Sequence, residues 1–202
     1  MENCSKCEEF DLTFNRRFRP SDFLEGKKNS LIWIVGLNPY GEPKTDNQKG
    51  LKELENYFEG SDIHPYFKDF KRVSERLFEL LGKDKGAAHT DVVKCFSKKL
   101  PSGKNAEIII NNCKNYLYEQ IKKYSPKIIL CNGVPVCKVI RQIIKPGKPD
   151  IGKNTTSYIG YLNNNKIAVI LSGFVGRIDN YAKCRLGKEI ESYMRMLYKN
   201  ES

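Results

Sequence analysis

Short apolar runs alternate with amphipathic segments along this 202-residue chain, and this alternation constrains its fold more than any other feature. The short runs are typical of buried strands, whereas the longer segments carry apolar side chains at helical spacing. Strands are expected at 31–36, 88–95, 127–131 and 166–171, and helices at 67–82, 106–124, 134–144 and 178–198. Strands that alternate with helices favour an α/β fold with a mainly parallel central sheet.

Length and composition favour a single globular domain over residues 1–202. Hydrophobic residues make up 40% of the chain and aromatic residues 11%, which is enough to bury a core. The sequence contains no run of eighteen apolar residues, and its polar start lacks the apolar core of a signal peptide. We therefore expect a cytoplasmic monomer without membrane contact.

The net charge of +11 indicates a polyanionic partner such as DNA. A lysine-rich composition can also produce a basic surface that has no role in nucleic-acid binding. Charge alone leaves both interpretations open.

Four of the seven cysteines have a spacing that suggests metal ligation: Cys4, Cys7, Cys95 and Cys113. The odd total argues against a disulfide framework in a reducing compartment. Four thiolates can hold a [4Fe–4S] cluster or a structural zinc ion, although zinc ribbons usually contain two close pairs and this chain has one. Either group would tie the N-terminal segment, residues 1–30, to the body of the fold.

Three sequence segments resemble those of the uracil-DNA glycosylase superfamily. They are Gly-Leu-Asn-Pro-Tyr-Gly at 36–41, Thr-Asp-Val-Val-Lys-Cys at 90–95, and the run from 126 to 133 that follows Cys113. Together with the N-terminal Cys-x-x-Cys pair, they are most similar to the iron–sulfur family 4 enzymes. The resemblance covers most of the chain.

This resemblance implies a three-layer α/β/α sandwich around a four-stranded, mainly parallel sheet. It also implies a [4Fe–4S] cluster on the four cysteines and a pocket for a flipped base at the carboxyl edge of the sheet. The implied activity is that of a monofunctional DNA glycosylase, which hydrolyses the N-glycosidic bond of a damaged or modified base.

The first loop departs from the family 4 pattern, in which an acidic residue occupies the position of Leu37. Asn38 instead matches the Gly-x-Asn-Pro form of the mismatch-specific enzymes, so it is the candidate for positioning water, and Glu42 is an alternative carboxylate. Gly36, Leu37 and Tyr40 are expected to border the base, with Tyr40 near the pyrimidine C5 position. An Asn-Pro pair can also simply start a turn.

Asp91 replaces the asparagine that family 4 enzymes usually place against the base. A carboxylate only accepts hydrogen bonds, so Asp91 favours a base with an exocyclic amine over plain uracil. A raised pKa would let Asp91 donate and restore an asparagine-like pattern. The alternative is a structural role as a cap.

The last segment, Leu-Ser-Gly-Phe at 171–174, lacks the histidine of the superfamily. Ser172 is expected at the base, Arg177 is a substitute cation, and Phe174 or Val175 is a candidate wedge into the duplex. Phe67, or alternatively Tyr66, is expected to stack on the base. The two histidines of the chain, His64 and His89, do not match the position of the catalytic histidine.

Lys98, Lys99 and Lys104 lie in and next to the loop after the second motif and are expected to face DNA phosphates. Two other functions remain open from the sequence. One is a degenerate glycosylase fold that binds DNA without catalysis, and the other is an iron–sulfur redox or sensor protein.

Overall fold

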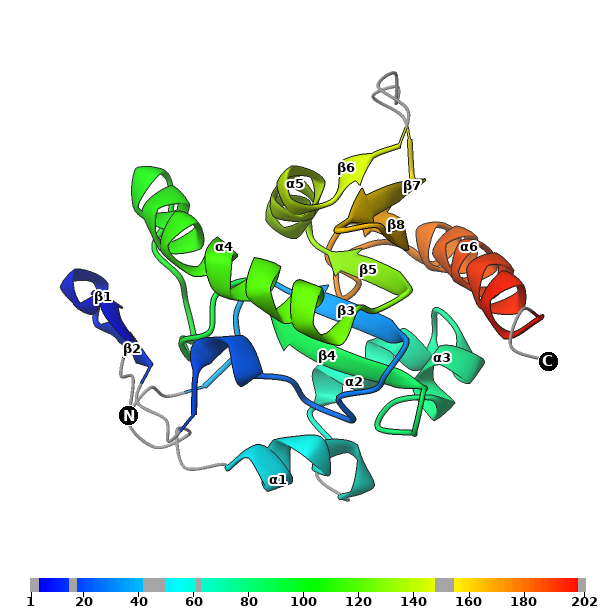
Figure 1. The fold of residues 1–202 in the computed structure, drawn as a ribbon, viewed down its shortest axis with the longest axis horizontal. Coiled ribbons are helices and arrows are strands. Elements are labelled where there is room, and N and C mark those ends of the chain that lie inside the picture. The colour runs from blue at the N-terminus through cyan, green and yellow to red at the C-terminus, as the bar shows by residue number, and fades with distance from the viewer. Residues whose placement is uncertain (1–3, 15–17, 42–49, 61–62, 148–154, 200–202) are drawn as a thin grey trace.

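A six-stranded mixed sheet forms the centre of the computed structural model, which describes residues 4–14, 18–41, 50–60, 63–147 and 155–199 (Figure 1). The strand order is β4-β3-β5-β8-β7-β6. The strands are β3 (Ile32–Gly36), β4 (Ala87–Asp91), β5 (Ile128–Asn132), β6 (Lys145–Pro146), β7 (Ser157–Leu162) and β8 (Asn165–Ser172). The first four in this order are parallel to one another, and β7 and β6 extend the sheet in antiparallel fashion.

Helices cover both faces of this sheet, so the fold is a three-layer α/β/α sandwich (Figure 1). On one face, α4 (Lys104–Tyr124) and α5 (Val134–Ile143) bury apolar side chains against the strands. On the other face, α2 (Pro65–Lys71), α3 (Glu75–Glu79) and α6 (Asn180–Lys199) do the same. Apolar burial on both faces explains the continuous hydrophobic runs in β3, β5 and β8, whereas β4 also buries the polar residues His89, Thr90 and Asp91.

The expected α/β class is confirmed, but the sheet has six strands rather than four. The two additional strands are β6 and β7, which pair with each other and, through β7, with β8. In β7, buried Tyr158, Gly160 and Leu162 alternate with more exposed residues, and a turn with positive φ at Asn163 and Asn164 leads into β8. This alternation and the Asn-Asn turn are typical of a hairpin.

Two of the expected boundaries were also wrong. The helix expected over 67–82 is divided in two: α2 ends at Lys71, and Ser74 then caps the start of α3, with its Oγ accepting from Leu77 N at 3.1 Å. The strand expected to reach Cys95 ends at Asp91.

The N-terminal part of the chain forms a separate layer against α4 and the loop after β4. It contains the antiparallel hairpin β1 (Cys4–Cys7) and β2 (Leu12–Phe14), drawn in dark blue in Figure 1. This N-terminal part also contains the short helices η1 (Glu8–Phe10) and η2 (Pro20–Asp22). Two further short helices, α1 (Leu51–Glu55) and η4 (Tyr57–Glu59), follow β3 in the chain. In the described ranges, no helix is long and apolar enough to cross a membrane.

Candidate active site

The site is built where the parallel strands end together. Gly36 is in register with Asp91, and Asn132 with Ser172, so the loops after β3, β4, β5 and β8 all leave the same edge of the sheet. Ligands of such sheets bind at this edge. The first two loops also run side by side, because Val93 N donates to Leu37 O at 2.9 Å.

Asn38 has a fixed side-chain orientation in the first loop. Its Nδ2 donates to Pro39 O at 3.0 Å and to Ser97 O at 2.9 Å, which joins this loop to the one that follows β4. An amide nitrogen has two hydrogens, so both are used. The Oδ1 atom of half-buried Asn38 therefore remains as the acceptor of this side chain, which suits the positioning of a water molecule.

A buried cluster of titratable groups lies beside this loop on β4. His89 Nδ1 is 2.7 Å from Glu25 Oε2, and His89 Nε2 is 3.8 Å from Asp91 Oδ1. His89 is 6% exposed and Asp91 2% exposed. His89 Nε2 and Asp91 Oδ2 are buried without a hydrogen-bond partner within the described residues. Each of these two atoms can therefore make a further hydrogen bond.

Gly36 makes room for the cluster. A Cβ atom at this position would lie 2.3 Å from Asp91 Oδ1 and 3.1 Å from His89 Nε2, so a side chain at Gly36 would clash with both groups. The glycine of the first motif is therefore required by close packing against the second.

The charges in this cluster influence one another strongly. Burial raises the pKa of Asp91 to about 6, against the opposing effect of His89. Burial alone would lower the pKa of His89, but the carboxylates of Asp91 and Glu25 outweigh it and raise that pKa. The His89 imidazolium is thus favoured by a carboxylate on either side of the ring.

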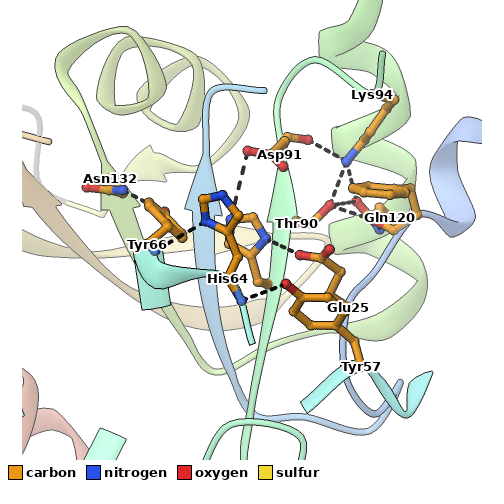
Figure 2. A network of polar contacts seen from close by, with 11 residues as sticks. Glu25, Tyr57, His64, Tyr66, Thr90, Asp91, Lys94, Gln120 and Asn132 are labelled. Carbon is orange, nitrogen blue, oxygen red and sulfur yellow. Dashed lines mark hydrogen bonds and ion pairs between the residues drawn. The ribbon is translucent and has the colours of Figure 1, made fainter. Parts of the chain in front are cut away.

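Lys94 folds back into the protein and is buried. Its Nζ donates to Thr90 Oγ1 at 2.7 Å, to Gln120 Oε1 at 2.9 Å and to the Asp91 carbonyl oxygen (Figure 2). Burial lowers the pKa of Lys94 to about 7. Gln120 Nε2 in turn donates to Phe23 O at 2.7 Å, so this network fixes the end of β4 and, with it, the Asp91 side chain.

Aromatic rings form one wall of the site. Tyr66 stacks on Phe174 at 6.1 Å between centroids, and both Tyr66 and Phe67 pack edge-on against His89. Phe67 is 2% exposed and belongs to the core, whereas Tyr66 lies nearer the surface. Asn132 holds this wall in place, because its Nδ2 donates to Tyr66 OH at 2.6 Å (Figure 2). Its Oδ1 accepts from Val175 N at 2.7 Å.

The other predicted base-binding residues border the site at varying depth. Leu37 is half-buried against the core, and Tyr40 is 62% exposed with its ring 5.9 Å from that of His64. Ser172 is half-buried and lines an open groove of about 690 Å³ between β8 and α6, a groove that neither Asn38 nor the cluster on β4 lines. Glu42 lies outside the described residues.

The predicted DNA-binding residues lie on the exposed loops of the same edge. The Arg177 guanidinium is 5.8 Å from the ring centroid of Phe174, which is 43% exposed. Val175, the other candidate wedge, is wrongly placed for this role because it is fully buried. The exposed lysines of the second loop and of the start of α4 are Lys98, Lys99 and Lys104.

Sequence reasoning assigned no role to Glu25 or Asn132, and it placed His89 near the pocket only as a minor alternative to a structural role. Glu25 lies in an irregular stretch, and only its backbone pairing with β4 brings it to His89, with both N–H···O distances at 2.8 Å. No local sequence pattern predicts this pairing. Asn132 was identifiable in principle, since it is a polar residue at the carboxyl end of a buried strand.

The four predicted metal ligands gather in one apolar cluster between the N-terminal hairpin and α4. Cys7, Cys95 and Cys113 are buried and Cys4 is half-buried. Burial, aided by the neighbouring cysteines, raises the pKa of Cys113 to about 11. Tyr116 OH donates to Cys4 Sγ at 3.5 Å, and Asn112 Nδ2 donates to Cys7 Sγ at 3.4 Å.

The donor types, four thiols with hydrogen-bond donors to two of the sulfurs, are those that an iron–sulfur cluster requires. Within the part of the chain that the structure describes, no three histidine, cysteine or acidic side chains lie close enough together to hold a metal ion.

The fold and the site define an α/β protein with a polar ligand site at the carboxyl edge of its parallel strands. The family model of the uracil DNA glycosylase superfamily matches residues 23–173, which is well over half of the chain. The chain therefore belongs to the uracil DNA glycosylase superfamily. Members of this superfamily act on DNA and generally hydrolyse N-glycosidic bonds of bases, so membership suggests DNA glycosylase activity. No curated protein matches the chain at a significant level.

Proposed function

We propose that the protein flips a damaged or modified base out of DNA and excises it by hydrolysing its N-glycosidic bond, without a lyase step. The observation that carries this proposal is the orientation of Asn38. With both Nδ2 hydrogens held by the backbone, Asn38 Oδ1 is free to accept a hydrogen bond from the attacking water. Within the superfamily, we also propose that the protein is most similar to the iron–sulfur family 4 enzymes.

In this mechanism the flipped base enters beside Gly36, between the two aligned loops. The water held by Asn38 forms a bond to C1′ as the C1′–N bond breaks, and the electron pair leaves with the base. The transition state is oxocarbenium-like, and the proton lost by the water ends on the departing base. Arg177 supplies a cation at the position where the superfamily usually has a histidine, and Glu42 is a second candidate for positioning water.

The test compares Asn38→Ala with Asn38→Asp on oligonucleotides that carry uracil, hypoxanthine, xanthine or modified cytosines. We expect Asn38→Ala to slow base release about 100-fold or more, as is typical when a positioned catalytic group is removed, with little change in DNA affinity. Asn38→Asp keeps an acceptor but loses both donations to the carbonyl oxygens of Pro39 and Ser97, so it should lose activity as well if this anchoring matters. Release that is unaffected in Asn38→Ala would overturn the assignment of this site.

The alternative is a catalytically degenerate fold that binds DNA. The missing histidine of the last motif favours it, because the residues after β8 offer instead one cation and Phe174, which stacks on Tyr66 of α2. Tight binding to DNA or to an abasic site, with no base released from any of these oligonucleotides, would establish this alternative.

We also propose that Cys4, Cys7, Cys95 and Cys113 hold a [4Fe–4S] cluster with a structural role, zinc being the alternative. Anaerobically purified protein should then contain about four irons per chain and absorb visible light. Cys113→Ser should lose the iron, whereas Cys184→Ser, at an exposed cysteine, should keep it. Stoichiometric zinc without iron would contradict the cluster.

A further inference from the structure

His89 has a place in the site that the superfamily motifs do not assign to it. Building on the proposed base excision, we propose that His89 and Asp91 together bind the lactam edge of the flipped base, which is a ring carbonyl next to a ring N–H. In this arrangement His89 Nε2–H donates to the carbonyl oxygen, and Asp91 accepts the ring N–H. Glu25 is a positioning residue that acts through His89.

The proposal starts from two buried atoms that have no partner. His89 Nε2 and Asp91 Oδ2 make no hydrogen bond within the described residues, although their side chains are 6% and 2% exposed. Buried polar atoms in folded proteins nearly always have a partner, so two adjacent exceptions indicate a ligand. The nearest atoms of the two side chains, His89 Nε2 and Asp91 Oδ1, are 3.8 Å apart.

The hydrogen-bond partner of His89 Nδ1 determines whether His89 Nε2 can donate or accept a hydrogen bond. The Glu25 carboxylate, 2.7 Å away, accepts from His89 Nδ1, so a neutral ring would present a bare Nε2. The second carboxylate, that of Asp91, favours an added proton at Nε2. The remaining charged or titratable groups around the cluster are Lys94, Tyr57 and Tyr66.

The imidazolium of His89 and the carboxylate of Asp91 place a donor next to an acceptor. A single asparagine amide presents the same pair, which explains how Asp91 can replace that residue in the second motif. Gly36 lets the first loop approach this pair closely, since a Cβ there would lie 3.1 Å from His89 Nε2 and closer still to Asp91.

This pair discriminates between bases by chemistry. Uracil and hypoxanthine present a carbonyl oxygen beside a ring N–H, whereas cytosine and adenine present an amine beside a bare ring nitrogen. The second pattern would set donor against donor at His89 and acceptor against acceptor at Asp91. Asp91 considered alone favours an amine-bearing base, so His89 reverses that expectation. Guanine and thymine share the lactam edge, and other walls of the pocket must exclude them.

The experiment measures single-turnover excision from oligonucleotides that differ in one base: uracil against cytosine, and hypoxanthine against adenine. We expect the lactam base of each pair to be released at least 100-fold faster. His89→Leu should reduce that release about 100-fold while leaving affinity for an abasic-site oligonucleotide unchanged. His89→Gln, whose amide donates without a charge, should recover part of the rate.

The pH profile separates binding from a merely structural role. Wild-type release of the lactam base should decline as the pH rises through the pKa of His89, and His89→Gln should not show this decline. His64→Gln, at the other histidine, should keep the wild-type profile. Equal or faster release of cytosine or adenine, or an unchanged rate in folded His89→Leu, would overturn the proposal.

The absence of base release from every oligonucleotide would instead contradict the proposed excision. In that case, the binding of free bases to the protein tests separately whether His89 and Asp91 bind the lactam edge. The ring resonances of His89 should shift on titration with uracil or hypoxanthine and not with cytosine or adenine. The reverse preference, or no shift with any base, would refute it.

Discussion

At the scale of single residues, Asp91 should make the stability of the protein depend on pH. Burial raises its pKa from 3.8 to about 6, so the folded protein retains a proton that the unfolded chain releases. This contribution is fully present below pH 3.8 and is lost as the pH rises through about 6. The raised pKa of His89 acts in the same direction at higher pH.

Asp91→Asn removes the first effect and weakens the second, because it removes the carboxyl and leaves Glu25 as the one carboxylate that raises the pKa of His89. Between pH 5 and pH 8, the wild type should lose roughly 1–2 kcal/mol more of its free energy of unfolding than the variant does. Urea denaturation at several pH values measures this difference. Parallel pH profiles for the two proteins would show that Asp91 is not perturbed.

Gly36→Ala tests the close approach between the first two motifs. The new methyl group would lie 2.3 Å from Asp91 Oδ1, so the carboxylate and the His89 ring would have to move. We expect destabilisation of about 1–3 kcal/mol and a larger than tenfold loss of base release. Gly60→Ala is the matched control, since a Cβ there has its nearest neighbour, Tyr57 O, at 3.8 Å. Similar losses in both variants would contradict this explanation.

At the scale of secondary-structure elements, the sequence predicts the parallel part of the sheet well. The apolar runs of β3, β5 and β8 stand out, and Asn38 and Asp91 follow or end strands whose carboxyl ends must share an edge. The division between α2 and α3 depends on the Ser74 cap. The sequence does not predict it, because the apolar residues continue at helical spacing through both helices. The pairing of Glu25 with β4 is tertiary, so no local propensity could indicate it.

Asn132 connects three elements, and its loss should separate them. Asn132→Ala leaves the buried Val175 N–H without a partner and removes the hydrogen bond to Tyr66 OH. We expect destabilisation of about 1–3 kcal/mol, because an unsatisfied buried donor carries its full desolvation cost. Tyr66→Phe loses only the second bond and should cost less. Urea denaturation of both variants checks the order, and an equal or greater cost for Tyr66→Phe would contradict it.

At the scale of the whole molecule, the sequence predicts a basic protein but not where its charge acts. The sheet supplies that information, because the loop after β4 and the start of α4 lie at the edge where the candidate site opens. Helix α4 then runs away from this edge, since it must return to the opposite end of the sheet before β5 begins. Its two ends therefore offer lysines at the site and far from it.

The salt dependence of DNA binding should distinguish these two ends. Lys104 begins α4 and Lys122 lies near its end, about 27 Å further along the helix axis, and both are exposed. If Lys104 contacts a phosphate, Lys104→Ala should weaken binding to all sequences and reduce the slope of log K against log salt by about 1. Lys122→Ala should leave the slope unchanged. Fluorescence anisotropy from 50 to 300 mM salt, roughly the range in which counterion release is measurable, would reveal the difference. Equal slopes for the two variants would place the DNA on another face.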